Sequence, residues 1–90
     1  MFLIEDYWHA EWIGEFPSRA EAVAELHRLA SLAWDEEPNR CPCTSWRTCS
    51  RRYHLIQFDT SEKPYRTISD DPCLEVSDTE TKWLIELNRD

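Results

Sequence analysis

Three cysteines stand close together near the middle of the chain, in a segment without helical or strand periodicity. They are Cys41, Cys43 and Cys49, and His54 follows them shortly afterwards. Three thiolates and one further sulfur or imidazole ligand make up a common tetrahedral zinc site. The sequence offers two candidates for the fourth ligand, His54 and Cys73. The Cys-x-Cys step is tighter than the usual spacing of zinc ligands, so the metal site is one interpretation among three.

The same cysteines allow two other interpretations. A disulfide between Cys43 and Cys49 would close a short loop and stabilise the fold by about 2.4 kcal/mol. The neighbouring arginines would lower the pKa of Cys49 and favour redox chemistry at its thiolate. In the simplest interpretation the cysteines are small buried apolar residues. Trp46 then closes an edge of the sheet, and the arginines pair with the acidic residues 35–37.

The cysteine segment is also the only positive region of an acidic chain. The protein has 90 residues and a formal charge of −8, yet residues 40–58 contain four arginines and no acid. A positive region in an acidic surface steers anionic partners toward one place, and Trp with Arg is typical of interface hot spots. We therefore interpret the chain as a binding module rather than an enzyme, with a protein or an anionic ligand as partner of residues 40–54. The predicted binding residues are Arg40, Trp46, Arg47, Arg51 and Arg52.

Part of this segment has a recognisable pattern, P-C-T-S-W-R-T-C-x-R-x-Y, which runs from Pro42 to Tyr53. The pattern resembles a segment of small bacterial proteins that have no assigned activity. The strong part of the resemblance covers about a fifth of the chain, and a looser part covers the strand and helix before it. The resemblance implies a bacterial or phage origin and no particular activity. It draws attention to four residues as a group: Cys43, Trp46, Cys49 and Arg51.

Composition excludes several classes of function. Gly14 is the only glycine, so neither common glycine-rich phosphate loop can form. The charge of −8 argues against duplex DNA as a partner, because DNA affinity depends on Lys and Arg contacts to phosphates. The same charge admits a further alternative, an acidic mimic of nucleic acid that occupies a basic groove. No apolar run is long enough to span a membrane, and residues 1–6 lack the basic start of a secretory signal, so we expect a cytoplasmic protein.

The rest of the sequence predicts the elements that position this segment. A capping box at Ser18 and Glu21 begins a helix that covers residues 18–33. Alternating apolar and β-branched residues predict the extended segments. These are strands at residues 2–8, 11–16, 53–58 and 82–87, and two short segments, 65–69 and 73–76, around a turn at 70–72.

These elements predict a single α+β domain over residues 1–90 with the order ββαβββ. The sheet is expected to be mainly antiparallel, with one helix packed on one face and an irregular Cys/Arg-rich loop at about 35–52. Such a sheet can leave its other face to solvent or to a partner, and an open face or an edge strand would allow a homodimer. Trp12 and Trp83 are expected in the core, and Trp8 on the open face.

Overall fold

Five strands form one antiparallel sheet in the computed structural model, which describes residues 1–61 and 63–87. The strand order across the sheet is β2-β1-β3-β4-β5, and each neighbouring pair is antiparallel. The order along the chain, ββαβββ, confirms the prediction of an α+β domain. The strands are β1 (Phe2–Asp6), β2 (Glu11–Phe16), β3 (Arg51–Asp59), β4 (Arg66–Val76) and β5 (Thr81–Trp83).

The single α-helix, α1, covers Arg19–Ser31 and begins at the predicted cap. The side chain of Ser18 accepts a hydrogen bond from the backbone N–H of Glu21 at 3.2 Å, which satisfies one of the free donors of the first turn. The helix ends two residues earlier than predicted, because Leu32 is extended and its backbone N–H donates to the carbonyl of Leu29. The capping box therefore located the start of the helix correctly.

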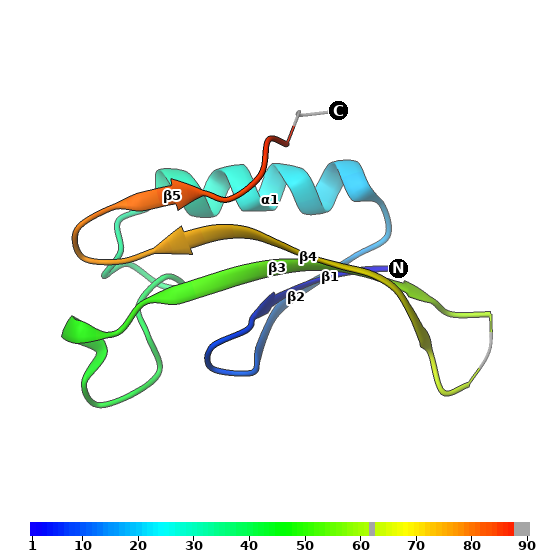
Figure 1. Ribbon diagram of the computed structural model, residues 1–90, viewed down its shortest axis with the longest axis horizontal. Helices are drawn as coiled ribbons and strands as arrows, with labels where there is room; N and C mark the ends of the chain where they lie inside the picture. Colours follow the sequence, from blue (N-terminus) through cyan, green and yellow to red (C-terminus); the bar gives the residue numbers. More distant parts are fainter. Residues whose placement is uncertain (62, 88–90) are drawn as a thin grey trace.

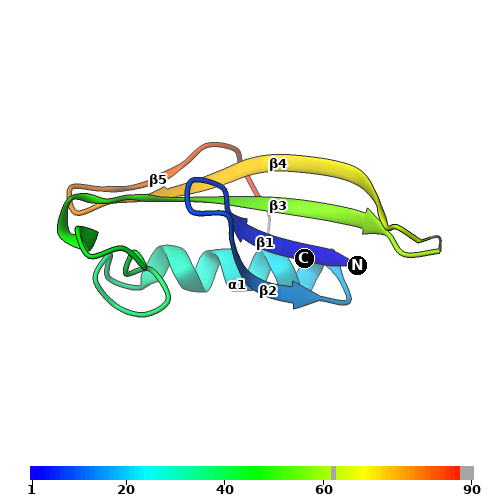
Figure 2. The ribbon, with the colours of Figure 1, turned by 90° about the horizontal axis from the view of Figure 1, so that it is seen from below.

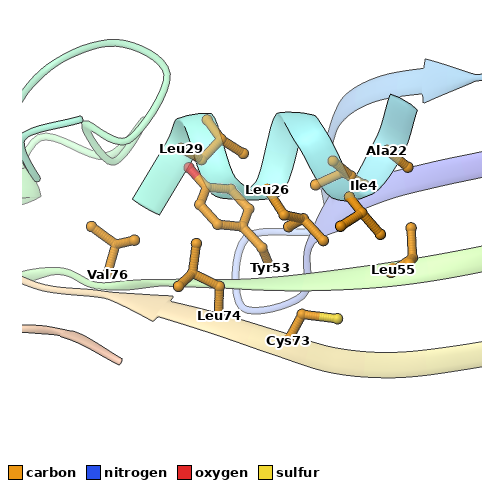
Figure 3. Close-up of a cluster of buried hydrophobic side chains, with 10 residues drawn as sticks. Ile4, Ala22, Leu26, Leu29, Tyr53, Leu55, Cys73, Leu74 and Val76 are labelled. Carbon is orange, nitrogen blue, oxygen red and sulfur yellow. The ribbon is translucent and has the colours of Figure 1, made fainter. Parts of the chain in front are cut away.

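Helix α1 covers one face of the sheet, and the core lies between these two layers (Figures 1 and 2). Figure 3 shows side chains of α1 pointing toward those of β1, β3 and β4. Burial of apolar surface in this layer is the main source of stability for so small a domain. The buried core residues are Ile4, Ala22, Val23, Leu26, Leu29, Tyr53, Leu55, Cys73, Leu74 and Val76.

Two predicted extended segments are a single strand in the structure. Residues 66–76 form one continuous strand, β4, and Pro72 lies within it opposite His54. Proline has no N–H for a sheet ladder and is tolerated at bulges and edges. Here the register between β3 and β4 shifts next to this pair, between Tyr53 and His54. On the other side of β4, β5 pairs only with residues 74–76, so Pro72 has no strand partner there among the described residues. The predicted turn at 70–72 was therefore wrong.

Two further predictions differ from the structure near the sheet edges. The last strand is shorter than the predicted 82–87, because only Thr81–Trp83 pairs with β4. Trp83 packs against the core as predicted, but the side chain of Trp12 is 62% exposed. In β2 the core contacts come from Ile13 and Phe16 instead, so Trp12 is not a core residue.

The irregular segment between α1 and β3, residues 32–50, lies at the end of the sheet away from the N-terminus, and the β1–β2 turn points toward the same end (Figures 1 and 2). In that turn Ala10 has a positive φ of 50°, which reverses the chain tightly just after His9. Within the described residues, the structure has no helix long and apolar enough to cross a membrane.

Candidate metal centre

Residues from two separate parts of the chain converge at this end of the sheet. His9 comes from the β1–β2 turn, and Cys41 and Cys49 come from the segment between α1 and β3. A ring nitrogen of His9 and the sulfur atoms of these two cysteines all lie within 4.8 Å of one another. The sulfur of Cys43 lies 2.7 Å from that of Cys49, which adds a third thiol to the group. We call these four residues the Cys/His cluster, and residues 40–50 the cysteine loop.

The His9 ring is held in place by a buried carboxylate. Its Nδ1 lies 2.6 Å from Oδ2 of Asp6, whose side chain is fully buried. The other carboxylate oxygen, Oδ1, accepts hydrogen bonds from the backbone N–H groups of Trp8 and Arg52, both at 3.2 Å. A neutral His9 that donates its Nδ1 proton to Asp6 keeps Nε2 as a lone-pair donor. Metal-binding histidines commonly have such a carboxylate partner.

Arg51 joins this carboxylate to the cysteine loop. Its side chain is 2% exposed, and its guanidinium donates to Oδ2 of Asp6 at 3.0 Å. The same group donates to the backbone carbonyls of Asn39 at 3.0 Å and Arg40 at 2.6 Å. A planar guanidinium with donors in several directions suits this arrangement, which a lysine would not reproduce. Arg51 thus holds the start of the cysteine loop next to the β1–β2 turn that carries His9.

Asn39 ties the same part of the loop to the end of the helix. Its buried side-chain amide donates to the carbonyl of Leu29 at 2.9 Å and, at 3.3 Å, to those of Leu32 and Ala33. Its Oδ1 accepts a hydrogen bond of 2.8 Å from the hydroxyl of Tyr53 in β3. The last carbonyls of a helix lack partners within the helix, so this side chain acts as a C-terminal cap. The residue just before the cysteine loop is therefore held against both the end of α1 and β3.

The cysteine loop folds back on itself between two of the thiols. The backbone N–H of Trp46 donates to the carbonyl of Cys43, and that of Cys49 donates to the carbonyl of Trp46. A short 3₁₀ helix, η1 (Trp46–Thr48), lies between them. The Ser45 hydroxyl lies 3.8 Å from both sulfur atoms. Cys41 is buried, whereas Cys43 and Cys49 are half-buried.

The three thiols of the cluster have different acidities. A hydrogen bond from the Cys49 thiol lowers the pKa of Cys43 to about 7, with help from Ser45 and His9. The same hydrogen bond raises the pKa of Cys49, which keeps the shared proton. Burial raises the pKa of Cys41 to about 11. The expectation that arginines lower the pKa of Cys49 was therefore wrong, because its neighbour Cys43 has the larger effect.

The exposed arginines of the loop pack on an aromatic side chain. The guanidinium carbon of Arg40 lies 4.3 Å from the ring centroid of Trp46, and that of Arg47 lies 5.2 Å from it. The ring of Trp34 contacts the same indole, with a centroid distance of 5.6 Å. Such cation–π contacts stabilise an exposed arginine by about 0.5–1 kcal/mol. Arg40, Trp46 and Arg47 therefore form one patch on the loop.

Four residues singled out from the sequence lie elsewhere. Nδ1 of His54 donates to the carboxylate of Asp70 at 2.7 Å and the ring stacks on Tyr7, and Cys73 is a core residue. Neither of these two candidates for the fourth ligand belongs to the group of metal-ligating atoms in the described chain. Arg51, a predicted binding residue, is buried among the contacts given above. Arg52 lies over the ring of Trp8, with its guanidinium carbon 5.9 Å from the centroid.

His9 and Asp6 were not singled out from the sequence as parts of a site. They lie more than thirty positions before the first cysteine, so no spacing motif connects them. The only sequence feature that connects them is their spacing of three residues at a predicted turn. An Asp and a His at this spacing are common in turns and do not by themselves indicate a site. The pairing of β1 with β3 places this turn next to the chain that leaves the cysteine loop, with Asp6 opposite Tyr53.

Comparisons of this chain with protein-family models, curated proteins and solved structures find no match. The chemistry of the Cys/His cluster must therefore be judged from its own atoms. Three sulfur atoms and one imidazole nitrogen are the donor set of a Cys₃His zinc site.

A metal in the cluster would require the Cys43 side chain to move, because its sulfur is not among the three ligand atoms that all lie within 4.8 Å of one another. With Zn–S bonds of about 2.3 Å and tetrahedral angles, two bound sulfur atoms lie about 3.8 Å apart. The sulfur atoms of Cys43 and Cys49 are now 2.7 Å apart and would have to separate by about 1 Å. Cys43 lies on a partly exposed loop, where such a movement meets little packing. The cluster thus contains donor atoms of the kind that thiophilic cations prefer, and a pair of thiols in contact.

Proposed function

We propose that this protein is a zinc-binding domain in which Cys41, Cys43, Cys49 and His9 bind one Zn²⁺ ion. The supporting observation is the convergence of His9 with the cysteines, together with the buried carboxylate that orients its ring. Asp6 occupies one ring nitrogen of His9 and leaves the other with a lone pair, and two cysteine sulfur atoms lie within 4.8 Å of a ring nitrogen. The thiolate donor set favours zinc over calcium or magnesium, which prefer oxygen ligands.

The proposed role of the metal is structural. Four protein ligands leave no position free for a substrate or a reactive water, which is typical of structural zinc sites. The cysteine loop has one short 3₁₀ turn, and within it only Cys41 is buried, so it has little apolar packing of its own. A metal bound by Cys41, Cys43 and Cys49 would cross-link this loop to the β1–β2 turn through His9. Metal binding then contributes directly to the stability of the fold.

Native mass spectrometry of the reduced protein tests this proposal. We expect one zinc ion per chain after purification in the presence of zinc, and its loss with a strong chelator. His9→Ala and Cys41→Ser should each lower the zinc affinity by at least about tenfold. The matched controls are His54→Gln and Cys73→Ala, which change the same residue types outside the cluster and should keep full zinc binding. A protein that binds no zinc, or binds it equally well without His9, would contradict the proposal.

A second candidate function rests on the patch formed by Arg40, Trp46 and Arg47. The two arginines are exposed and packed on the indole, so they present positive charge on an ordered aromatic surface. We propose that this patch binds an acidic protein segment, with the metal site holding the loop in shape. Interfaces of this kind depend on aromatic and arginine residues.

A labelled poly-glutamate peptide provides a direct probe for this patch. The double variant Arg40→Ala/Arg47→Ala should lose binding that the parent shows at low salt, since the peptide needs both charges. The matched control is Lys63→Ala/Arg66→Ala, which removes the same charge near the β3–β4 turn, where Arg66 pairs with Asp59 at the end of β3 away from the cysteine loop. Equal loss in both double variants would show that only net charge matters and would argue against a specific patch.

A further inference from the structure

The two half-buried thiols of the Cys/His cluster lie in direct contact with each other. The sulfur atoms of Cys43 and Cys49 are 2.7 Å apart, between the length of a disulfide, about 2.05 Å, and the separation of about 3.8 Å in a zinc site. The same pair of atoms is therefore within a short movement of either arrangement. The two arrangements exclude each other, because one pair of sulfur atoms cannot satisfy both distances.

We propose that Cys43 and Cys49 form a reversible, peroxide-oxidised disulfide that releases the zinc ion. This inference rests on the proposed zinc site and assigns a regulation to it. A disulfide removes two of the four ligands, and the remaining pair, Cys41 and His9, cannot complete a tetrahedral site. Oxidation would then convert the cysteine loop from a metal-linked state to a disulfide-linked state.

The loop already holds the two thiols in position for this reaction. Backbone hydrogen bonds from Trp46 to Cys43 and from Cys49 to Trp46 close the chain between them. The hydroxyl of Ser45 lies 3.8 Å from each sulfur and can hydrogen-bond to either. Disulfide formation therefore needs no long-range rearrangement, only movement within a single turn of chain.

Cys43 and Cys49 are more exposed to solvent than the other two cysteines, and we therefore expect them to be oxidised first. Cys43 and Cys49 are half-buried and accessible to a small oxidant, whereas Cys41 is 7% exposed and Cys73 is fully buried in the core. Reversible thiol oxidation depends on access as well as on thiolate character. Cys41 would thus remain reduced when the pair is oxidised, and it could rebind metal together with His9 after reduction.

The reaction balances with hydrogen peroxide as the oxidant. The Cys43 thiolate attacks one peroxide oxygen, the O–O bond breaks, and a sulfenic acid and a hydroxide ion form. The Cys49 thiolate then attacks the sulfenic sulfur, the S–O bond breaks, and a second hydroxide leaves as the disulfide forms. The two sulfur atoms together lose two electrons, which reduce one peroxide to two hydroxide ions, and two protons from solvent convert these to water.

The test uses zinc-loaded protein treated with increasing hydrogen peroxide, with free zinc followed by a chromogenic chelator and disulfides mapped by peptide mass spectrometry. We expect one zinc released for each Cys43–Cys49 disulfide, and rebinding of zinc after dithiothreitol. The Cys73→Ala variant should behave like the parent, because its thiol takes no part. Zinc retained through the oxidation, a disulfide that joins Cys41 to Cys49, or over-oxidation without a disulfide would each overturn the proposal.

The same experiment separates this proposal from the zinc site on which it rests. If the reduced parent protein binds no zinc, the proposed zinc site fails, and zinc release with it. The pairing itself is then read from metal-free protein, where a Cys43–Cys49 disulfide under peroxide would support the oxidisable pair and its absence would overturn it. If the protein binds zinc but peroxide leaves the metal in place, the zinc site stands and only the redox regulation fails.

Discussion

Nδ1 of His9 lies 2.6 Å from Oδ2 of Asp6, and this contact leaves Nε2 as the ring nitrogen that is free to bind a metal. The carboxylate is fully buried and is held by Arg51 and by two backbone N–H groups. Because carboxylates only accept hydrogen bonds, the proton of a neutral His9 lies on Nδ1, and Nε2 is available as a ligand. The relationship links a buried charge network to the chemistry of the cluster.

Asp6→Asn should lower the zinc affinity by about 10- to 100-fold. The amide has a donor where His9 and Arg51 also donate, so His9 is expected to move its proton to Nε2 and lose its ligand lone pair. A competition titration against a zinc chelator measures the change. The matched control is Asp70→Asn, which alters the equivalent contact with His54, 2.7 Å long, outside the cluster. Unchanged affinity in Asp6→Asn would show that the carboxylate does not orient the ligand.

Arg51→Ala should destabilise the fold by about 3–5 kcal/mol, because it leaves the buried carboxylate of Asp6 without its cation. Arg47→Ala, which removes an exposed arginine of the cysteine loop, should change the free energy of unfolding by no more than about 1 kcal/mol, the contribution of its cation–π contact. Urea unfolding of the metal-free proteins measures both. Similar effects of the two substitutions would mean that the burial of Arg51 has no energetic consequence.

Asn39→Ala should destabilise the fold by about 2–3 kcal/mol, since it leaves helix carbonyls and the Tyr53 hydroxyl without partners. Tyr53→Phe removes only one hydrogen bond and should cost about 1 kcal/mol. In the double variant the two effects should not add, because both substitutions remove the same contact of 2.8 Å. Fully additive effects in urea unfolding would argue that the contact between Asn39 and Tyr53 contributes nothing.

The stability of the fold should fall at alkaline pH through the buried thiol of Cys73. Burial raises its pKa from 9.0 to about 11, so the folded chain keeps a proton that the unfolded chain loses. The stability from this group is therefore fully present below pH 9 and decreases as the pH rises toward 11, by on the order of 2 kcal/mol. The stability difference between the parent and Cys73→Ala should narrow over this range. A difference that is independent of pH would contradict the burial effect.

Several features of the fold followed from local sequence. Ser18 and Glu21 located the start of α1, and the apolar alternation of residues 2–8 and 11–16 located β1 and β2 to within two residues. The turn at 70–72 was the local error: Asp-Asp-Pro is a common turn sequence, but pairing with β3 keeps these residues extended and places a register shift beside Pro72. Pairing between strands depends on residues that are distant in the sequence, so local propensity cannot predict it. Here the pairing of β4 with β3 prevailed over the local preference of these residues for a turn.

For the candidate site too, some features follow from the sequence alone and others depend on the tertiary structure. The sequence alone determined that three cysteines, Trp46 and the basic residues share one irregular segment, because these residues are neighbours in the chain. Only the tertiary structure decided that His9, not His54 or Cys73, completes the Cys/His cluster, and that Arg51 lies inside the protein. The physical reason is the pairing of β1 with β3, which places the β1–β2 turn beside the cysteine loop although the two are far apart in sequence. A buried Asp6 then needs a cation, and Arg51 is the residue that β3 brings within reach of it.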